Sequence, residues 1–141
     1  MTKRELSCPS TSASDPDAAV FGIVSGTARE PDLIYLEQPV ALSELPLPPD
    51  VPAAEMYRLV GSCAQRECGN WTGSRCRLGQ QIAHDLPVVV DSAPPCSIRR
   101  TCRWFAEEGV PACLRCPQVV THTHVPLREQ ARRAKRQLPV V

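Results

Sequence analysis

The chain has 141 residues and a formal net charge of +1, with 15 prolines and only 4% aromatic residues. This length favours one domain with flanking tails. Because large apolar side chains are scarce, we expect a thin core that needs a covalent or metal crosslink to fold. No stretch reaches the ~20 apolar residues of a membrane helix, and the N-terminus lacks the apolar segment of a secretory signal. We therefore expect a cytoplasmic protein with no membrane partner.

The first part of the chain predicts a small sheet and no chemistry. Residues 1–17 are polar and predict a disordered tail, in which Cys8 would be a stray exposed thiol. Residues 18–42 contain two β-branched, apolar runs around a turn-rich loop and predict a β-hairpin. Residues 43–54 hold four prolines and predict an extended connector. We place the single domain at residues 18–125.

Seven of the eight cysteines lie together in residues 55–125, which we interpret as a metal-binding region. They are Cys63, Cys68, Cys76, Cys96, Cys102, Cys113 and Cys116. Cytoplasmic thiols are kept reduced, so clustered cysteines there bind metal more often than they form disulfides. The fold class that follows is small, metal-dependent α+β: an N-terminal β-hairpin, then short helices and loops around a cysteine cluster.

Two helices are predicted between the cysteines. Residues 76–84 have apolar side chains at helical spacing, and Pro87 ends that pattern. Residues 101–108 form a second candidate helix, which Gly109 would end in a left-handed conformation.

The histidines are weaker ligand candidates than the cysteines. His84 would lie about 12 Å along a helix from Cys76, too far to share one metal ion with it. His122 and His124 alternate in an extended segment, so at most one could reach a metal bound near Cys113.

An iron–sulfur cluster is the leading metal hypothesis. Such clusters take about four thiolates, and a Cys-x2-Cys pair followed by proline recurs in them. Cys113, Cys116 and Pro117 match that fragment, with both cysteines on one predicted helical face. Arginines near the cysteines could offset the negative charge of a cluster. One or two 4Fe–4S clusters are compatible with the cysteine count.

Two alternatives stay open. Structural zinc also takes four thiolates, and Cys96, Cys102, Cys113 and Cys116 could supply them. The first three cysteines, Cys63, Cys68 and Cys76, are then one ligand short. Thiol redox chemistry at the Cys-x2-Cys pair is the third reading, although it leaves the other cysteines unexplained.

The cysteine pattern also resembles a set of small, uncharacterised bacterial cysteine-rich proteins. The matching segments are CRWFAEEGVPACLRCPQVVT, the upstream C-x4-C, GSRCRLG and PPCSIR, within a resemblance that extends over residues 18–122. The resemblance implies a bacterial cytoplasmic protein with all seven cysteines as ligands, and it suggests an iron–sulfur role. It implies no substrate.

The C-terminal residues 126–141 are basic and predict a helix or tail that could contact nucleic acid.

Catalytic triads, a phosphate-binding loop and dinucleotide motifs are absent from the sequence, so we expect no enzyme. The leading hypothesis is an iron–sulfur electron carrier, redox sensor or accessory subunit of a larger enzyme, with a protein partner. The second is a zinc-stabilised binding module, and the third a thiol oxidoreductase.

Overall fold

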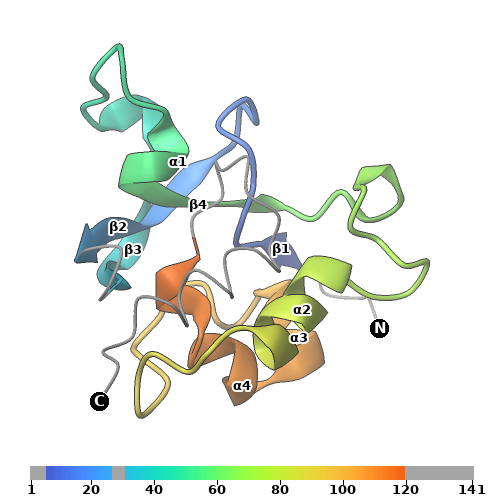
Figure 1. The fold of residues 1–141 in the computed structure, drawn as a ribbon. Helices are drawn as coiled ribbons and strands as arrows, with labels where there is room; N and C mark the ends of the chain where they lie inside the picture. Colours follow the sequence, from blue (N-terminus) through green and yellow to red (C-terminus); the bar gives the residue numbers. More distant parts are fainter. Residues whose placement is uncertain (1–5, 27–30, 120–141) are drawn as a thin grey trace.

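A four-stranded antiparallel sheet and several short helices make up a small α+β fold in the computed structural model, which describes residues 6–26 and 31–119. The sheet has the strand order β1-β4-β2-β3 (Figure 1). The strands are β1 (Ser7–Cys8), β2 (Ala19–Gly26), β3 (Pro31–Ala41) and β4 (Tyr57–Ser62). The α-helices are α1 (Ala53–Met56), α2 (Arg77–Asp85), α3 (Arg103–Glu108) and α4 (Val110–Cys113). The 3₁₀ turns are η1 (Leu42–Glu44), η2 (Gln65–Glu67) and η3 (Cys116–Gln118).

The sheet is built around β2, which pairs antiparallel with both β3 and β4. Both strands expected within residues 18–42 are therefore present, while their connection, residues 27–30, lies outside the described residues. The register of β2 shifts between Val20 and Gly22 against both neighbours. This bulge gives Phe21 no partner in either ladder, and its side chain is fully buried.

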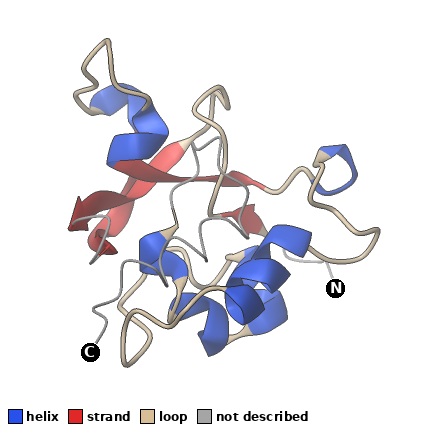
Figure 2. Ribbon diagram, viewed as in Figure 1, coloured by secondary structure: helices blue, strands red, loops and turns tan. Residues whose placement is uncertain are grey.

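Helices cover both faces of the sheet. Figure 2 shows α2, α3 and α4 together on one side and α1 on the other. Successive side chains of a strand point to opposite faces, so Tyr57 and Leu59 pack with α1 residues, whereas Val60 packs into the larger core. That larger core also contains Phe21 and Trp104. Of the metal-ligand candidates, Cys102 belongs to this larger core, and Cys76, Cys96 and Cys116 pack against it.

The two predicted helices are confirmed. The first corresponds to α2, which begins after Cys76, and the second to α3, which ends at Gly109 with a φ of 75°. Glycine adopts that positive φ without a steric penalty. Residues 45–52 form no helix or strand, whereas the two ends of the connector expected at residues 43–54 lie in η1 and in α1. No described helix is long and apolar enough to cross a membrane.

The expectation of a disordered N-terminal tail is wrong for residues 6–17. Ser7 and Cys8 form β1, an edge strand whose partners on β4 are Ser62 and Gly61. The chain then turns over the sheet, where the backbone N–H of Thr11 donates to the carbonyl oxygen of Leu59 over 3.3 Å. A two-residue strand has no detectable hydrophobic period, so the sequence pattern could not identify it.

Helices α2 and α3 meet at Gly79 and Trp104. A Cβ atom placed on Gly79 would lie 2.6 Å from Cδ1 of Trp104, well inside van der Waals contact. Trp104 is only 1% exposed, so its ring is packed inside the protein and not free on the surface. Glycine at this position therefore lets the helix backbone approach the indole ring directly.

We predict that Gly79→Ala lowers the free energy of unfolding by about 2 kcal/mol because of this overpacking, although alanine favours helices over glycine. Urea denaturation followed by circular dichroism measures the change. Gly69→Ala is the matched control, since a Cβ there meets no atom within 4 Å. An unchanged or raised stability of Gly79→Ala would contradict this packing.

Candidate metal centres

The eight cysteines divide into two groups of four, each lining its own cavity. The upstream cysteines are Cys8, Cys63, Cys68 and Cys76. The downstream cysteines are Cys96, Cys102, Cys113 and Cys116. All eight are free thiols. Trp104 lines both cavities, so its ring lies between the two groups.

The upstream cavity has a volume of about 260 Å³ and an apolar wall formed by Trp71, Leu78 and Trp104. Four separate elements bring its thiols together. Cys8 lies on β1, Cys63 follows β4, Cys68 ends η2 and Cys76 caps the start of α2.

Hydrogen bonds to sulfur already exist at three upstream cysteines. The backbone N–H of Asn70 donates to Cys68 Sγ and that of Gly79 to Cys76 Sγ, each over 3.4 Å. Arg103 Nε donates to Cys63 Sγ over 3.0 Å. Such donors orient thiolate ligands and stabilise their negative charge in metal sites.

Arg103 is itself fixed beside the upstream cavity. Its guanidinium lies 4.9 Å from the centre of the Trp71 ring, and Nη1 donates to Glu107 Oε2 over 2.9 Å. The other oxygen of Glu107 accepts from the backbone N–H of Cys76 over 2.9 Å. Two side chains of α3 thus bind the upstream cysteines: Arg103 contacts Cys63, and Glu107 contacts Cys76. The sequence suggested only that arginines near the cysteines could offset negative charge.

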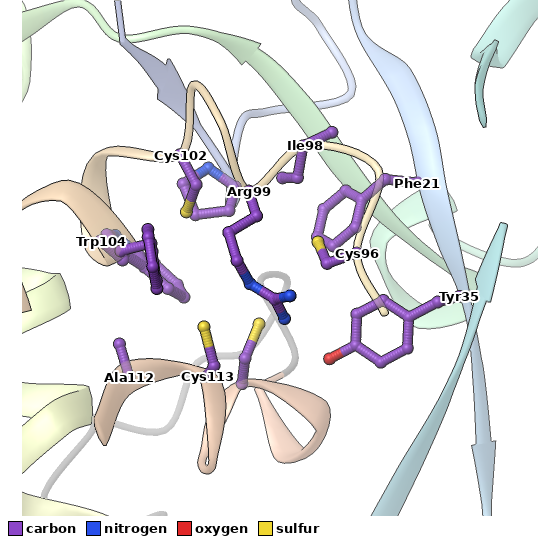
Figure 3. A pocket seen from close by; sticks show the side chains of 12 residues that line it. Phe21, Tyr35, Cys96, Ile98, Arg99, Cys102, Trp104, Ala112 and Cys113 are labelled. Carbon is purple, nitrogen blue, oxygen red and sulfur yellow. The ribbon is translucent and has the colours of Figure 1, made fainter. Parts of the chain in front are cut away.

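Aromatic and apolar side chains line the downstream cavity, which Figure 3 shows from close by. Phe21, Ile98, Trp104 and Phe105 contribute to its wall. The Arg99 side chain extends into the space between the thiols in Figure 3. The remaining volume is about 20 Å³, roughly the room that one water molecule needs.

The Cys-x2-Cys pair adopts a different geometry from the one expected. Helix α4 ends at Cys113, and the separate turn η3 begins at Cys116, so the two cysteines do not share one helical face. Pro117 causes this break because a proline cannot continue the preceding hydrogen-bond ladder. Both thiols nevertheless line the same cavity.

A buried arginine connects the two groups. Arg58 is completely buried on β4, and its guanidinium packs against Phe21 and Trp104, 5.3 and 5.7 Å from their ring centres. Nη1 donates to the carbonyl oxygen of Cys116 over 2.6 Å, and Nη2 to that of Pro9 over 3.0 Å. Among the described residues no carboxylate pairs with Arg58.

Burial keeps several of these thiols protonated in the metal-free protein. The pKa of Cys8 is raised to about 11, mainly by desolvation and also by the neighbouring thiols of Cys63, Cys76 and Cys68. Desolvation likewise raises the pKa of Cys102 to about 12. The shifts for the other affected thiols have the same direction and the same main cause; these are Cys76, Cys96 and Cys113.

His84 lines neither of the two cavities. The His84 side chain is 65% exposed, and its Nε2 lies 3.3 Å from Glu108 Oε1. His122 and His124 lie outside the described residues. Within the described part of the chain, no three side chains of His, Cys, Asp or Glu converge closely enough to hold one metal ion as they stand.

Sequence reasoning missed Cys8 and placed it in a disordered tail. The number of cysteines could have indicated its role, because eight thiols make two sets of four. Cys63, Cys68 and Cys76 lacked a fourth ligand, and Cys8 was the remaining cysteine. Arg58 was also missed, because a single arginine in an apolar strand gives no sign of its partners.

In a comparison with known proteins, no family model, no curated protein and no solved structure matches the chain.

We predict that Arg58→Met lowers the free energy of unfolding by about 3 kcal/mol, because two buried carbonyl oxygens lose their donors. Urea denaturation followed by tryptophan fluorescence measures the loss. Arg66→Met, on the exposed turn η2, is the control and should stay within about 0.5 kcal/mol of the wild type. Equal stabilities of the two variants would show that Arg58 does not link these segments.

Proposed function

We propose that this chain is an iron–sulfur protein whose downstream cysteines bind a cluster, most simply 4Fe–4S. One observation carries the proposal. Cysteines from separate segments of the chain line one apolar cavity, and the charged groups at that cavity are arginines. Thiols gathered beside cations suit an anionic metal–thiolate centre, whereas a purely structural core rarely contains a buried cation without an anion.

The donor set fits a cluster better than a single ion. Four thiolates complete the coordination of a 4Fe–4S cluster, and four thiols line this cavity. Sulfurs around one zinc converge to within roughly 4 Å of each other, while cluster ligands surround an inorganic core of several atoms. Cysteines that line a cavity correspond to the arrangement of cluster ligands.

Space at the downstream site depends on Arg99. Its guanidinium fills the cavity, so a bound cluster requires this side chain to move outward. Arg99 lies on a turn and is only partly buried; its Nη2 donates to the carbonyl oxygen of Pro94, and its guanidinium lies 5.7 Å from the centre of the Phe105 ring. Outward movement breaks these two contacts, so cluster binding has to offset their loss, while the positive charge of the side chain can remain near the thiolates.

The surrounding residues would define the electronic environment of the cluster. A cluster supplies one-electron transfer at a potential that depends on burial, nearby charge and hydrogen bonds to sulfur. Phe21, Trp104 and Phe105 give the downstream cysteines an apolar surrounding. Arg58 donates to the carbonyl oxygen of Cys116 and adds positive charge, which favours the reduced, more negative state of a cluster.

These features support a non-catalytic cytoplasmic role as electron carrier, redox sensor or accessory subunit, with a protein partner. The thiol oxidoreductase alternative is disfavoured by the raised thiol pKa values, because reactive cysteines have lowered ones. The zinc-binding module that uses basic residues 126–141 to contact nucleic acid remains the competing proposal.

We predict that protein purified anaerobically is brown and contains iron and acid-labile sulfide in similar amounts, as thiolate-bound clusters do. Metal analysis and a sulfide assay of the same sample measure the iron and the acid-labile sulfide. Zinc without sulfide would contradict the iron–sulfur assignment and favour the zinc module.

We predict that Cys113→Ser and Cys116→Ser each lose the iron and sulfide held by the downstream cysteines, since removing one thiolate leaves the site incomplete. Iron and sulfide per chain are the measured quantities. Ser97→Ala is the control, an exposed neighbour of Cys96 that should keep the wild-type content. Wild-type iron and sulfide in both cysteine variants and in the double variant would exclude this pair as ligands.

A further inference from the structure

The upstream cysteines form a complete set of donors that the downstream site does not use. We propose that they bind a second iron–sulfur cluster, with Cys8 on the N-terminal strand as the fourth ligand. This inference rests on the proposed function and extends it from one cluster to two. It also assigns β1 a purpose, because a two-residue edge strand contributes little to sheet stability by itself.

Sheet pairing places Cys8 next to Cys63. Cys8 lies opposite Gly61 on β4, two residues before Cys63, and the backbone N–H of Cys63 donates to the carbonyl oxygen of Leu6 over 3.2 Å. The two cysteines therefore lie at the same end of the β1–β4 pair, although 55 positions separate them in the sequence.

Contacts on both sides of Cys8 fix its position. On one side, the backbone N–H of Ser7 donates to the carbonyl oxygen of Thr101 over 2.6 Å, and the two hydroxyl oxygens lie 2.9 Å apart. On the other side, Pro9 is fully buried and its carbonyl oxygen accepts from Arg58. An unused thiol in a tail would not need anchors on both neighbours.

The cavity itself suits a cluster. Its volume of about 260 Å³ leaves space between the thiols. Trp71 and Trp104 shield it from water on the side of the helices. Three of its sulfurs already accept hydrogen bonds, from Asn70, Gly79 and Arg103. These donors stabilise bound thiolates and raise the potential of a cluster.

This assignment accounts for every cysteine in the chain. Eight cysteines supply four ligands to each cavity, and none is left over. Trp104 lines both cavities, and Arg58 donates to the residue that follows Cys8 and to Cys116. Both sites therefore adjoin the same buried residues.

The test counts iron and sulfide per chain in full-length protein purified anaerobically. We expect Cys8→Ser and Cys8→Ala each to contain about half of the wild-type amounts. Combining Cys8→Ser with Cys63→Ser should cause no further loss, because both changes affect one site, whereas combining it with Cys113→Ser should remove nearly all iron. Ala13→Ser, an exposed change in the same segment, is the control and should retain the full content.

Wild-type iron and sulfide in Cys8→Ala would overturn the assignment of Cys8. Complete loss in Cys8→Ser with unchanged circular dichroism would overturn the two-site arrangement and indicate one shared centre. Wild-type protein that holds zinc and no sulfide would overturn the proposed function itself. The failure of the second site and the failure of the iron–sulfur assignment therefore give different results.

Discussion

The buried guanidinium of Arg58 is the constraint on which the arrangement of the cysteines depends. Its charge lies at zero exposure between two aromatic rings, and carbonyl oxygens of Pro9 and Cys116 accept its hydrogen bonds. Those two carbonyls belong to segments more than a hundred positions apart in the sequence. A buried cation without an anion is costly, so a negatively charged centre on either side would turn an unfavourable feature into a stabilising one.

Trp104 complements Arg58 by keeping the two groups of thiols apart. Its ring reaches the α2 backbone because residue 79 is a glycine, and it lines both cavities. The indole Nε1 makes no hydrogen bond. The ring therefore separates the two sulfur-rich cavities, and it would be a short apolar path between the two clusters that we propose.

Local structure and the downstream group of four cysteines were predictable from the sequence, and the position of Cys8 in the upstream group was not. The start of α2 after Cys76 and the end of α3 at Gly109 follow from periodicity and from glycine's conformational freedom, which are local properties. The position of Cys8 depends on pairing with Gly61 on β4, 53 positions away in the sequence. The break between Cys113 and Cys116 could have been inferred from Pro117, but the spacing alone suggested one helical face.

The thiols also belong to the hydrophobic core, and this links ligand binding to folding. Cys102 is a member of the larger core, and Cys76, Cys96 and Cys116 pack against it. In the metal-free protein burial favours neutral thiols, which behave as small apolar side chains. Metal bound at the proposed sites would replace those protons and tie β1, α2, α3 and η3 to common centres, so its free energy would add to folding. The same residues would then stabilise a thin core with few aromatic side chains both as packing groups and as ligands.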